Sequence, residues 1–456
     1  MRLPKLRTRE YVDVDSRGWR RAAALTMFLV FAGLVVLLQH DHHRTHWDAG
    51  GRLAWSVSIL VAVALIARGV LLGRPVTVGH ALAAAAVAGL GVVAHLFSFD
   101  LLGDVAIAGA GLALMWPMSA PLQPDALPRV WALVDATYGD PLAPFAMHSR
   151  KTPFFNAEGT AMLAYRTRLG FAVVSGDPIG NPAHFRALVA DFTAMCQAHG
   201  WRILVLGASQ RRLPLWTRTA TMRRTLRAVP IGRDVVIDVD HFDMVGRKYR
   251  NLRQAVRRTH NAGVSTEVVP EADLDEATLA ELTDVLECSH SGVRFERGFS
   301  MILDGALRGR YPGVLLIIAR DRFGQVQAFH RYALAGGGND VSLDVPWRRP
   351  GAPNGIDERL SVDMIRWAKN HGARRLSLAF SAFPELFADR HRGAVQQLFY
   401  GLIHLGDSLI RLESLYRYLR KYHALGERRY VLLALRHVLP ALIVLLTLEF
   451  MPHRRR

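Results

Sequence analysis

A short basic segment, GRKYRNLRQAVRRTHNAG at positions 246–263, has the residue types needed to hold a polyanion. Six Lys or Arg side chains lie between positions 247 and 258, and the segment has no acidic residue. At about 100° per residue, one face of a helix here carries Arg247, Arg250, Arg253 and Arg257. The opposite face carries Tyr249, Leu252, Ala255 and Val256. The apolar face is expected to pack on a core. The unneutralised basic face favours phosphate binding over the alternative, a merely solvated surface.

Histidines and cysteines are the residue types that could bind a metal or act as nucleophiles. The loop QHDHHRTHWD carries His40, His42, His43 and His46. A metal site is possible there, but a polar loop with unligated imidazoles is the favoured interpretation. Cys196 and Cys288 are far apart and have no metal-ligand spacing, so we expect reduced thiols that pack as small apolar residues. The sequence therefore predicts neither a metal centre nor a cofactor.

Composition and charge restrict the partners. The chain has 456 residues, enough for two or three domains, with 50% hydrophobic residues and a formal net charge of +18. From about Arg21 to Met118 charge is scarce outside one loop, whereas the chain after Pro121 is rich in arginine. A pI near 10.6 favours anionic partners, namely nucleic acid, anionic lipid or both.

The first 120 residues resemble a membrane region. Four apolar stretches, at 21–39, 53–72, 78–97 and 101–120, are long enough or nearly so to cross a bilayer. No cleavage-type site follows the first, so it is interpreted as an anchor. The basic residues of segment 1–20 predict a cytoplasmic N-terminus. Four spans would then return the chain to the cytoplasm, which predicts a multi-pass protein of the cell membrane with a cytoplasmic body.

The C-terminal segment at 431–456 is also apolar, but Arg436, His437 and Pro440 interrupt it. A fifth span would put the terminal arginines outside, against the positive-inside tendency. We therefore expect an interfacial helix with a basic tail on an anionic leaflet.

The body of the chain alternates helices and strands. Two mixed α/β halves of similar size, at 121–250 and 251–430, are expected, joined through the basic helix. A helix, an antiparallel hairpin, a helix and a strand in this order are typical of N-acetyltransferase-like domains. The acetyl-CoA signature of that class, Arg-x-x-Gly-x-Gly/Ala, which would bind a pyrophosphate at a helix start, has no match in the chain. An acyl donor other than acetyl-CoA is indicated.

Several stretches together carry a family resemblance: FFNAEGTAMLAYRTRLGFAVVSGDPIG, VLGAS, RNLRQAVRRTHNAG, ERGFSM, VSLDV followed by RRPGAPNG, RRLSLAF and RLESLYRYLRKY. From about residue 133 to 430 the chain resembles the C-terminal transferase domain of aminoacyl-phosphatidylglycerol synthases. These membrane enzymes move lysine or alanine from aminoacyl-tRNA to phosphatidylglycerol. The form fused to lysyl-tRNA synthetase is the most similar, although no synthetase follows here. The resemblance implies a tandem acetyltransferase-like fold with a tunnel between its halves.

The resemblance also implies catalytic residues. Asp344 matches the acid of a strand-borne Asp-Leu-Met-Arg motif, and Glu358, Tyr416 and Lys421 match retained positions. Lys421 would be a substrate-phosphate or catalytic cation. The alternatives are an exposed helix acid for Glu358, a core ring for Tyr416 and a surface cation for Lys421. Substrate binding is assigned to Arg250, Arg253, Arg257, Arg348 and Arg349.

Three departures from the family pattern stand out. Trp347 occupies the position of the motif's arginine, and Pro346 replaces its methionine. Arg348 follows at once, but neighbouring strand residues point to opposite faces. The family's asparagine is Ala379, and HALGERRY replaces a Pro-Glu-Trp segment.

Three functions remain open. The leading hypothesis is an aminoacyltransferase that moves Lys or Ala from aminoacyl-tRNA to phosphatidylglycerol or a related lipid. The alternative is a degenerate, non-catalytic relative that binds lipid or a partner protein at the membrane. A third possibility is an acyltransferase with a soluble donor, which would need no tRNA. The turn at Asp177 is expected to be structural.

Overall fold

The computed structural model describes residues 25, 49–217, 226–290, 299, 301–382 and 412–449. The chain divides into two compact units. The first comprises Met1–Ala120, Thr167–Ala172 and Phe192–Ile203, and the second comprises the rest of the chain.

Three packed helices form the described part of the N-terminal region: α2 (Ala49–Leu71), α3 (Val78–Leu96) and α4 (Asp100–Leu114). Glycines allow the helices to approach closely. A Cβ on Gly111 would lie 2.5 Å from the backbone oxygen of Ala62 on α2. Small residues at helix contacts are typical of packing inside a bilayer, where close backbone approach supplies the attraction.

A polar contact also joins these helices. Ser58 of α2 donates a hydrogen bond to Asp104 of α4 at 3.2 Å, and His95 of α3 lies 3.5 Å from the same carboxylate. Two helices, Leu53–Leu71 and Val78–Leu96, are long and apolar enough to cross a membrane. Helix α4, with 15 residues, is shorter than a typical span. The predicted first span at 21–39 lies, apart from Leu25, outside the described residues.

A mixed sheet of twelve described strands organises the body of the chain. Ten strands follow the order β1-β2-β3-β5-β12-β6-β11-β10-β9-β8, β7 ends the row, and β4 pairs with β2. The first-half strands are β1 (Thr152–Phe155), β2 (Ala161–Arg168), β3 (Phe171–Ser175), β4 (Ile179–Gly180), β5 (Arg202–Ser209) and β6 (Arg227–Asp238). The remaining strands are β7 (Ser265–Pro270), β8 (Val314–Arg320), β9 (Val326–Ala335), β10 (Asp340–Arg348), β11 (Arg375–Ala382) and β12 (Leu425–Leu433).

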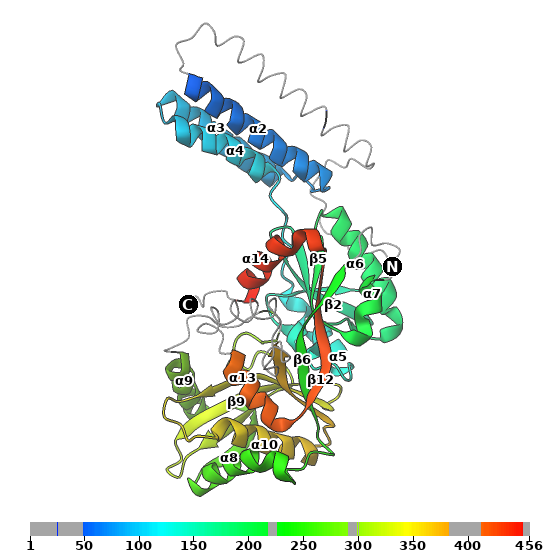
Figure 1. The fold of residues 1–456 in the computed structure, drawn as a ribbon, viewed down its shortest axis with the longest axis vertical. Coiled ribbons are helices and arrows are strands. Elements are labelled where there is room, and N and C mark those ends of the chain that lie inside the picture. Colours follow the sequence, from blue (N-terminus) through cyan, green and yellow to red (C-terminus); the bar gives the residue numbers. More distant parts are fainter. Residues whose placement is uncertain are drawn as a thin grey trace, which may run out of the picture. The chain divides into compact units, whose positions relative to one another are not determined.

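A strand from the end of the chain links the two predicted halves. β12, from the end of the chain, pairs with β5 and β6, and β6 pairs with β11. Figure 1 shows β12 running beside β6. Because β12 closes the gap between strands of the first half, residues on both sides of position 250 contribute to one continuous sheet.

The described helices of this body precede, separate and follow the strands along the chain. They are α5 (Leu127–Asp135), α6 (Phe185–Ala198), α7 (Leu213–Thr217), α8 (Arg250–Asn261), α9 (Glu276–His290), α10 (Ile356–Asn370), α13 (Leu412–Leu419) and α14 (Val438–Glu449). Single 3₁₀ turns add η2 (Pro124–Ala126), η3 (Ala143–Met147), η4 (Pro182–His184), η5 (Gln210–Arg212), η6 (Arg247–Tyr249), η7 (Glu271–Asp273), η8 (Arg420–Tyr422) and η9 (Leu435–His437).

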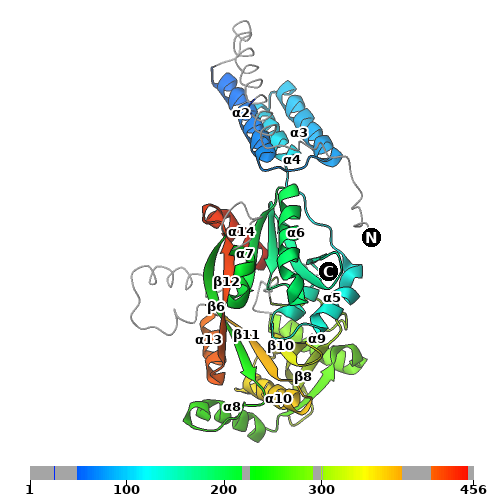
Figure 2. The ribbon, with the colours of Figure 1, turned by 90° about the vertical axis from the view of Figure 1, so that its right-hand side faces the viewer.

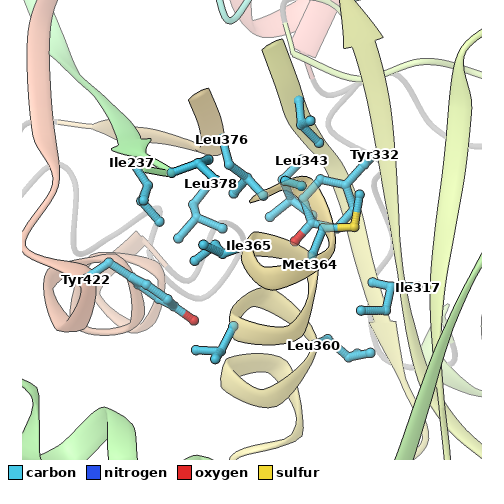
Figure 3. Packing of buried hydrophobic residues seen from close by; sticks show 14 of the residues in the cluster. Ile237, Ile317, Tyr332, Leu343, Leu360, Met364, Ile365, Leu376, Leu378 and Tyr422 are labelled. Carbon is cyan, nitrogen blue, oxygen red and sulfur yellow. The ribbon is translucent and has the colours of Figure 1, made fainter. Parts of the chain in front are cut away.

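The largest core of the second half forms on the α10 side of the sheet. Leu360 and Ile365 of α10 pack with sheet residues such as Leu343 and Leu376, and with Tyr422 of η8. Figure 3 shows these side chains directed toward one another around α10. Helix α8 packs on α10, as its apolar face predicted. Figure 2 shows the two helices together at one end of the domain.

Buried and exposed residues of α8 follow the predicted pattern. Tyr249, Leu252, Ala255 and Val256 are buried, whereas Arg247, Arg250, Arg253 and Arg257 are exposed. The prediction of an amphipathic basic helix is confirmed. So are the predicted α/β alternation and an antiparallel hairpin within it, formed by β8 and β9.

Candidate active site

A register shift in β10 decides where the predicted site residues point. Leu343 pairs with Tyr332, whereas Val345 pairs with Arg331, so Asp344 is the extra residue. Val341 and Leu343 pack on the α10 side. After the shift, Trp347 packs with residues of α9 on the other side. One inserted residue exchanges the two faces of a strand. Trp347 and Arg348 are therefore directed to opposite sides of the sheet.

Asp344 lies inside the protein in an ion cluster. Its Oδ1 accepts a hydrogen bond from the Leu303 amide at 2.9 Å, and its Oδ2 accepts one from Arg331 Nη1 at 2.8 Å. Arg331 also donates to Glu271, and both Asp344 and Arg331 side chains have 0% exposure. Burial, opposed by Arg331 and reinforced by Glu271, raises the pKa of Asp344 to about 7.

This ion cluster holds the segment at 301–311. Glu271 accepts from the amides of Arg308 and Gly309, and Asp344 accepts from Leu303. Asp304, next in the chain, accepts from the Ser149 amide at 3.0 Å. The resemblance implied a site role for Asp344, but its side chain has no exposed surface. Instead, both of its oxygens are occupied by groups of this segment and by Arg331.

Arg348 joins a different cluster, on the α10 side. Its Nη1 donates to Oδ2 of Asp357 at 3.1 Å. Nε2 of the buried His330 lies 3.2 Å from the other oxygen of the same carboxylate. Burial opposes ionisation of Asp357, but His330, Arg348 and Lys421 together lower its pKa. Arg348 thus does not share a site with Asp344.

Glu358 and Lys421 meet beside this carboxylate. Lys421 Nζ donates to Oε1 of Glu358. The Glu358 side chain is 10% exposed and that of Lys421 is 37% exposed, so the pair opens to solvent on the lysine side. Tyr418 lies behind it and contacts Ser361 at 2.5 Å. Tyr416, on α13 just before Lys421, is buried.

The basic helix adjoins this site through backbone contacts. Tyr249 donates to the Tyr422 carbonyl at 3.5 Å, and the His423 ring lies 3.2 Å from the Lys248 carbonyl. The start of α8 therefore lies against the turn that carries Lys421.

The remaining predicted arginines lie in three different environments. Arg250 and Arg257 project from the exposed face of α8. Arg253 instead donates to the carbonyls of Met244 and Gly246 and so closes the turn before the helix. Arg349 lies away from this cluster: it pairs with Asp284 of α9 at 2.6 Å and donates to the Val326 carbonyl.

A cavity of about 210 Å³ lies where the two halves of the sheet meet. Asp234 of β6, Ser342 of β10 and Arg375 of β11 contribute to its wall, as do Glu427 and Arg429 of β12. Charges in this wall have internal partners: Arg375 pairs with Asp340, and Arg211 with Glu427. The wall is therefore polar and contains both signs of charge.

Arg429 fixes the floor of this cavity. Its guanidinium donates to Asp234 at 2.7 Å, to Asp140 at 2.9 Å and to the Gly207 carbonyl at 3.0 Å, with Asp177 at 3.4 Å. Burial and the nearby Asp140 raise the pKa of Asp177 to about 6, although Arg429 opposes the shift. The Gly-Asp-Pro turn is thus held by a buried ion pair.

The buried charges were not predicted from the sequence. His330, Arg331 and Arg429 all lie within apolar strand patterns, and each is at most 1% exposed. A charged residue inside a strand is rarely buried without a partner. Their presence in FHRYALA and ERRYVLL was therefore an available signal for internal ion clusters.

The thiols and histidines can be placed in part. Cys196 is buried, and burial raises its pKa, which agrees with a core thiol. Cys288 is partly exposed. The histidine-rich loop at 40–46 and Ala379's side chain lie outside the described residues.

The fold places this body among two-part α/β domains built on one mixed sheet. Two solved structures share its fold. The structure of L-PGS from Bacillus licheniformis matches with a TM-score of 0.59 and 19% identity, covering 72% of this chain and 97% of that one. The C-terminal domain of a putative lysylphosphatidylglycerol synthetase from Agrobacterium fabrum matches with a TM-score of 0.59 and 20% identity, covering 71% and 97%.

Sequence comparison gives the family. The model of "Phosphatidylglycerol lysyltransferase, C-terminal" matches residues 131–433, and the chain belongs to this family. It is 59% identical to the MprF-like domain protein Rv1619 of Mycobacterium tuberculosis, over 99% of this chain and 94% of that protein. It is 32% identical to the lysylphosphatidylglycerol biosynthesis bifunctional protein LysX of Mycobacterium avium, over 64% of this chain but only 24% of LysX.

Proposed function

We propose that this protein is a membrane-bound aminoacyltransferase that moves an aminoacyl group, Lys or Ala, from aminoacyl-tRNA to phosphatidylglycerol or a related lipid. The observation that carries the proposal is the Glu358–Lys421 pair beside the basic helix α8, within a chain of the phosphatidylglycerol lysyltransferase family. An ion pair with a half-open cation, next to a row of exposed arginines, suits a substrate that carries several phosphates.

The proposed reaction exchanges one ester for another. The lipid's glycerol hydroxyl attacks the carbonyl carbon of the aminoacyl ester, and a new ester bond forms. The bond to the terminal ribose of the tRNA then breaks, and the ribose oxygen leaves with a proton. Positive charge near the reacting carbonyl stabilises the oxyanion that forms between these steps. No oxidant or reductant is needed, and no metal or cofactor is part of the proposal.

Roles follow from exposure. Lys421, which reaches solvent, is proposed to bind negative charge on the donor. Glu358 is proposed to orient Lys421, and to accept a proton or bind the donor's ammonium. Tyr416 is proposed to keep the turn before Lys421 in place. Asp344 has no exposed surface. It is therefore proposed to be a positioning residue, which holds the Leu303 amide and the Arg331 side chain in place. Arg348 and Arg349 are proposed to fix the segment that leads into α10.

The first turn of α10 argues against a coenzyme A donor. A helix N-terminus commonly binds a pyrophosphate because its free amides and dipole favour negative charge. Here Asp357 and Glu358 occupy that turn, and their carboxylates would repel a pyrophosphate. This agrees with the absence of an acetyl-CoA signature and favours a different activated acyl group.

Membrane attachment is proposed through the N-terminal helices. Leu53–Leu71 and Val78–Leu96 have mean hydropathies of 2.1 and 1.6, and only 28% and 11% of their apolar windows are buried within the structure. Exposed apolar surface of this size is disfavoured in water. We propose a multi-pass protein of the cell membrane with its transferase domain in the cytoplasm, where charged tRNA is present.

A second candidate function rests on Trp347. This ring packs 4.9 Å from Phe329 in a buried cluster, where the resembling family carries an arginine. A relative that has lost catalysis but binds anionic lipid or a partner at the membrane fits this substitution. Restoring Arg at 347 would bury an unpaired charge, so gain of function in that variant is not expected under either proposal.

The deciding experiment uses the full chain reconstituted in phosphatidylglycerol vesicles. Lysyl-tRNA or alanyl-tRNA carrying a labelled amino acid is added, and lipids are separated by thin-layer chromatography. The transferase predicts a labelled lipid that disappears after ribonuclease treatment of the donor. A labelled lipid that forms despite ribonuclease indicates a soluble donor. Tight vesicle binding without any labelled lipid favours the non-catalytic relative.

A further inference from the structure

The short helix α14 presents an unusual apolar surface. Outward from the domain it exposes large aliphatic side chains, including Leu439 at 75%, Ile443 at 55% and Leu442 at 50%. The inward stripe of Ala441, Val444 and Leu448 is buried. Residues three and four apart share a helix face, so both stripes are continuous. The helix thus buries one apolar face and still exposes a second.

Length and charge restrict what covers this face. The apolar helix at Leu435–Leu448 belongs to the 10–17 residue class, which is too short to cross a bilayer. Arg436 lies at the start of this segment, positions 454–456 are arginines, and the net charge is +18. An apolar stripe flanked by cations fits the boundary between acyl chains and anionic headgroups. The same chain also carries two helices long enough to cross a membrane.

We propose that the outward face of α14 rests in the surface of an anionic bilayer and fixes the height of the transferase domain above it. The occupant is the bilayer itself. This proposal needs no aminoacyl transfer, although its consequence for tRNA below rests on the proposed function.

Strand β12 sets that height. It connects the turn carrying Lys421 to η9 and α14 without interruption, over nine residues. At about 3.3 Å per residue, this strand is roughly 30 Å long. Figure 1 shows α14 at one end of β12, and α13 and α8 at the other. The central cavity, with Glu427 and Arg429 in its wall, lies between the two ends.

This height of the domain above the bilayer would separate two polyanions, the lipid headgroups and the tRNA, which charge alone cannot distinguish. The Debye length is about 8 Å at physiological ionic strength, far shorter than β12. With α14 at the bilayer, Arg250 and Arg257 at the far end are out of reach of its headgroups. The basic face of α8 then serves the donor tRNA, and the acceptor lipid has to reach the Glu358–Lys421 pair from the α14 end.

The test places a fluorescent probe at single positions of the full chain. Cys288→Ser removes the partly exposed thiol, and Cys196 remains buried. An environment-sensitive dye is attached to Leu442→Cys, Arg257→Cys or Phe323→Cys. Phe323 is the matched control because it is an apolar side chain exposed at 79%. Each protein is reconstituted in phosphatidylglycerol–phosphatidylcholine vesicles with and without lipids carrying a quencher at the shallow acyl positions.

The proposal predicts a blue shift and about threefold or stronger quenching at 442, with little change at 323 or 257. Quenching at 442 should fall when Leu439→Glu is added, and the unchanged signal at 323 shows that such a variant is folded. An unquenched 442 probe overturns the proposal. A probe at 442 that contacts a second copy of the chain and not the bilayer also overturns the proposal. Quenching at 257 equal to that at 442 overturns it as well.

Discussion

At the scale of single residues, pairing determines which charges are available to a substrate. Lys421 has a buried partner in Glu358 but keeps more than a third of its own surface exposed. The side chains of Asp344 and Arg331 have no exposed surface. A charge that is fully enclosed by partners can orient a segment, whereas a half-exposed charge can contact a ligand. Lys421 is therefore the charge of this cluster that can contact a ligand, whereas Asp344 and Arg331 can only hold the surrounding segment in place.

Replacing Lys421 tests this assignment. Lys421→Met should lower the rate of aminoacyl transfer about 100-fold or more, since one charged donor at a developing oxyanion contributes on that order. Lys369→Met, an exposed lysine on α10, is the control and should retain activity. The double variant with Glu358→Gln should lose little more than the single one, because interacting residues are not additive. Equal losses for Lys421 and Lys369 would contradict the assignment.

Asp344 should make stability depend on pH. Its pKa is raised to about 7 by burial, whereas an unfolded aspartate titrates near pH 4. Between these values the folded state keeps a proton that the unfolded chain loses. The contribution to stability is therefore complete below about pH 4 and is lost as pH rises through 7.

Thermal unfolding of Asp344→Asn, compared with the unchanged protein from pH 5 to pH 8, measures this effect. The asparagine variant should show a flatter dependence of Tm on pH. Parallel curves would show that the carboxyl group has an ordinary pKa in the folded protein.

At the scale of elements, α8 and β12 carry distinct tasks. The sequence pattern predicted α8 because four arginines and four apolar residues repeat at helical spacing, and packing followed that pattern. It did not predict that β12 would enter the sheet between β5 and β6, since strand order depends on contacts between residues more than 190 positions apart. The buried ion clusters were missed for the same reason: Asp234 and Arg429 meet only after this insertion.

The register of β10 illustrates the same limit at the site. Alternation alone places Trp347 and Arg348 on opposite faces, as expected. Which face each one occupies depends on the extra residue at Asp344, and no local pattern announces it. The family resemblance identified Glu358 and Lys421, which the structure brings into contact. It could not foresee that Asp344 would be enclosed by Arg331.

The basic face of α8 should bind tRNA through its phosphates. The double variant Arg250→Ala and Arg257→Ala should weaken tRNA binding and reduce the slope of log affinity against log salt by about 2, one for each phosphate that is no longer neutralised. Arg322→Ala, at an exposed site on the β8–β9 turn, is the control. Fluorescence anisotropy of labelled tRNA at several salt concentrations measures both. An unchanged slope in the double variant would exclude this face from tRNA binding.

Removing Arg429 should destabilise the whole sheet. Arg429→Met leaves the carboxylates of Asp140, Asp177 and Asp234 buried without their cation, at a cost of about 3–5 kcal/mol. Arg428→Met, its exposed neighbour on β12, should cost far less. Arg429 opposes the rise in the pKa of Asp177, which is about 6 with the guanidinium present. In the variant this pKa should rise further, so the destabilisation should diminish as pH falls toward 6. Denaturant unfolding at pH 5 and pH 7.5 measures it, and equal effects of the two variants would contradict the role of Arg429.

At the scale of the whole molecule, three features combine: apolar N-terminal helices, a continuous sheet that joins two α/β halves, and an excess of 18 positive charges. An enzyme that links a membrane lipid to a polyanionic, water-soluble donor needs each of them. In the proposed transferase the helices would provide attachment, the sheet would hold a fixed separation between its two ends, and the charge would attract the donor. Membership of the phosphatidylglycerol lysyltransferase family is consistent with this division of labour.

The most direct measurement is single-turnover transfer by the purified full chain in phosphatidylglycerol vesicles, with labelled lysyl-tRNA and alanyl-tRNA tested separately. Label should move into the lipid fraction with one of the two donors, and Lys421→Met should abolish most of that transfer while Lys369→Met does not. If neither donor labels any lipid, although the unchanged protein is folded and membrane-bound, the transferase account is contradicted.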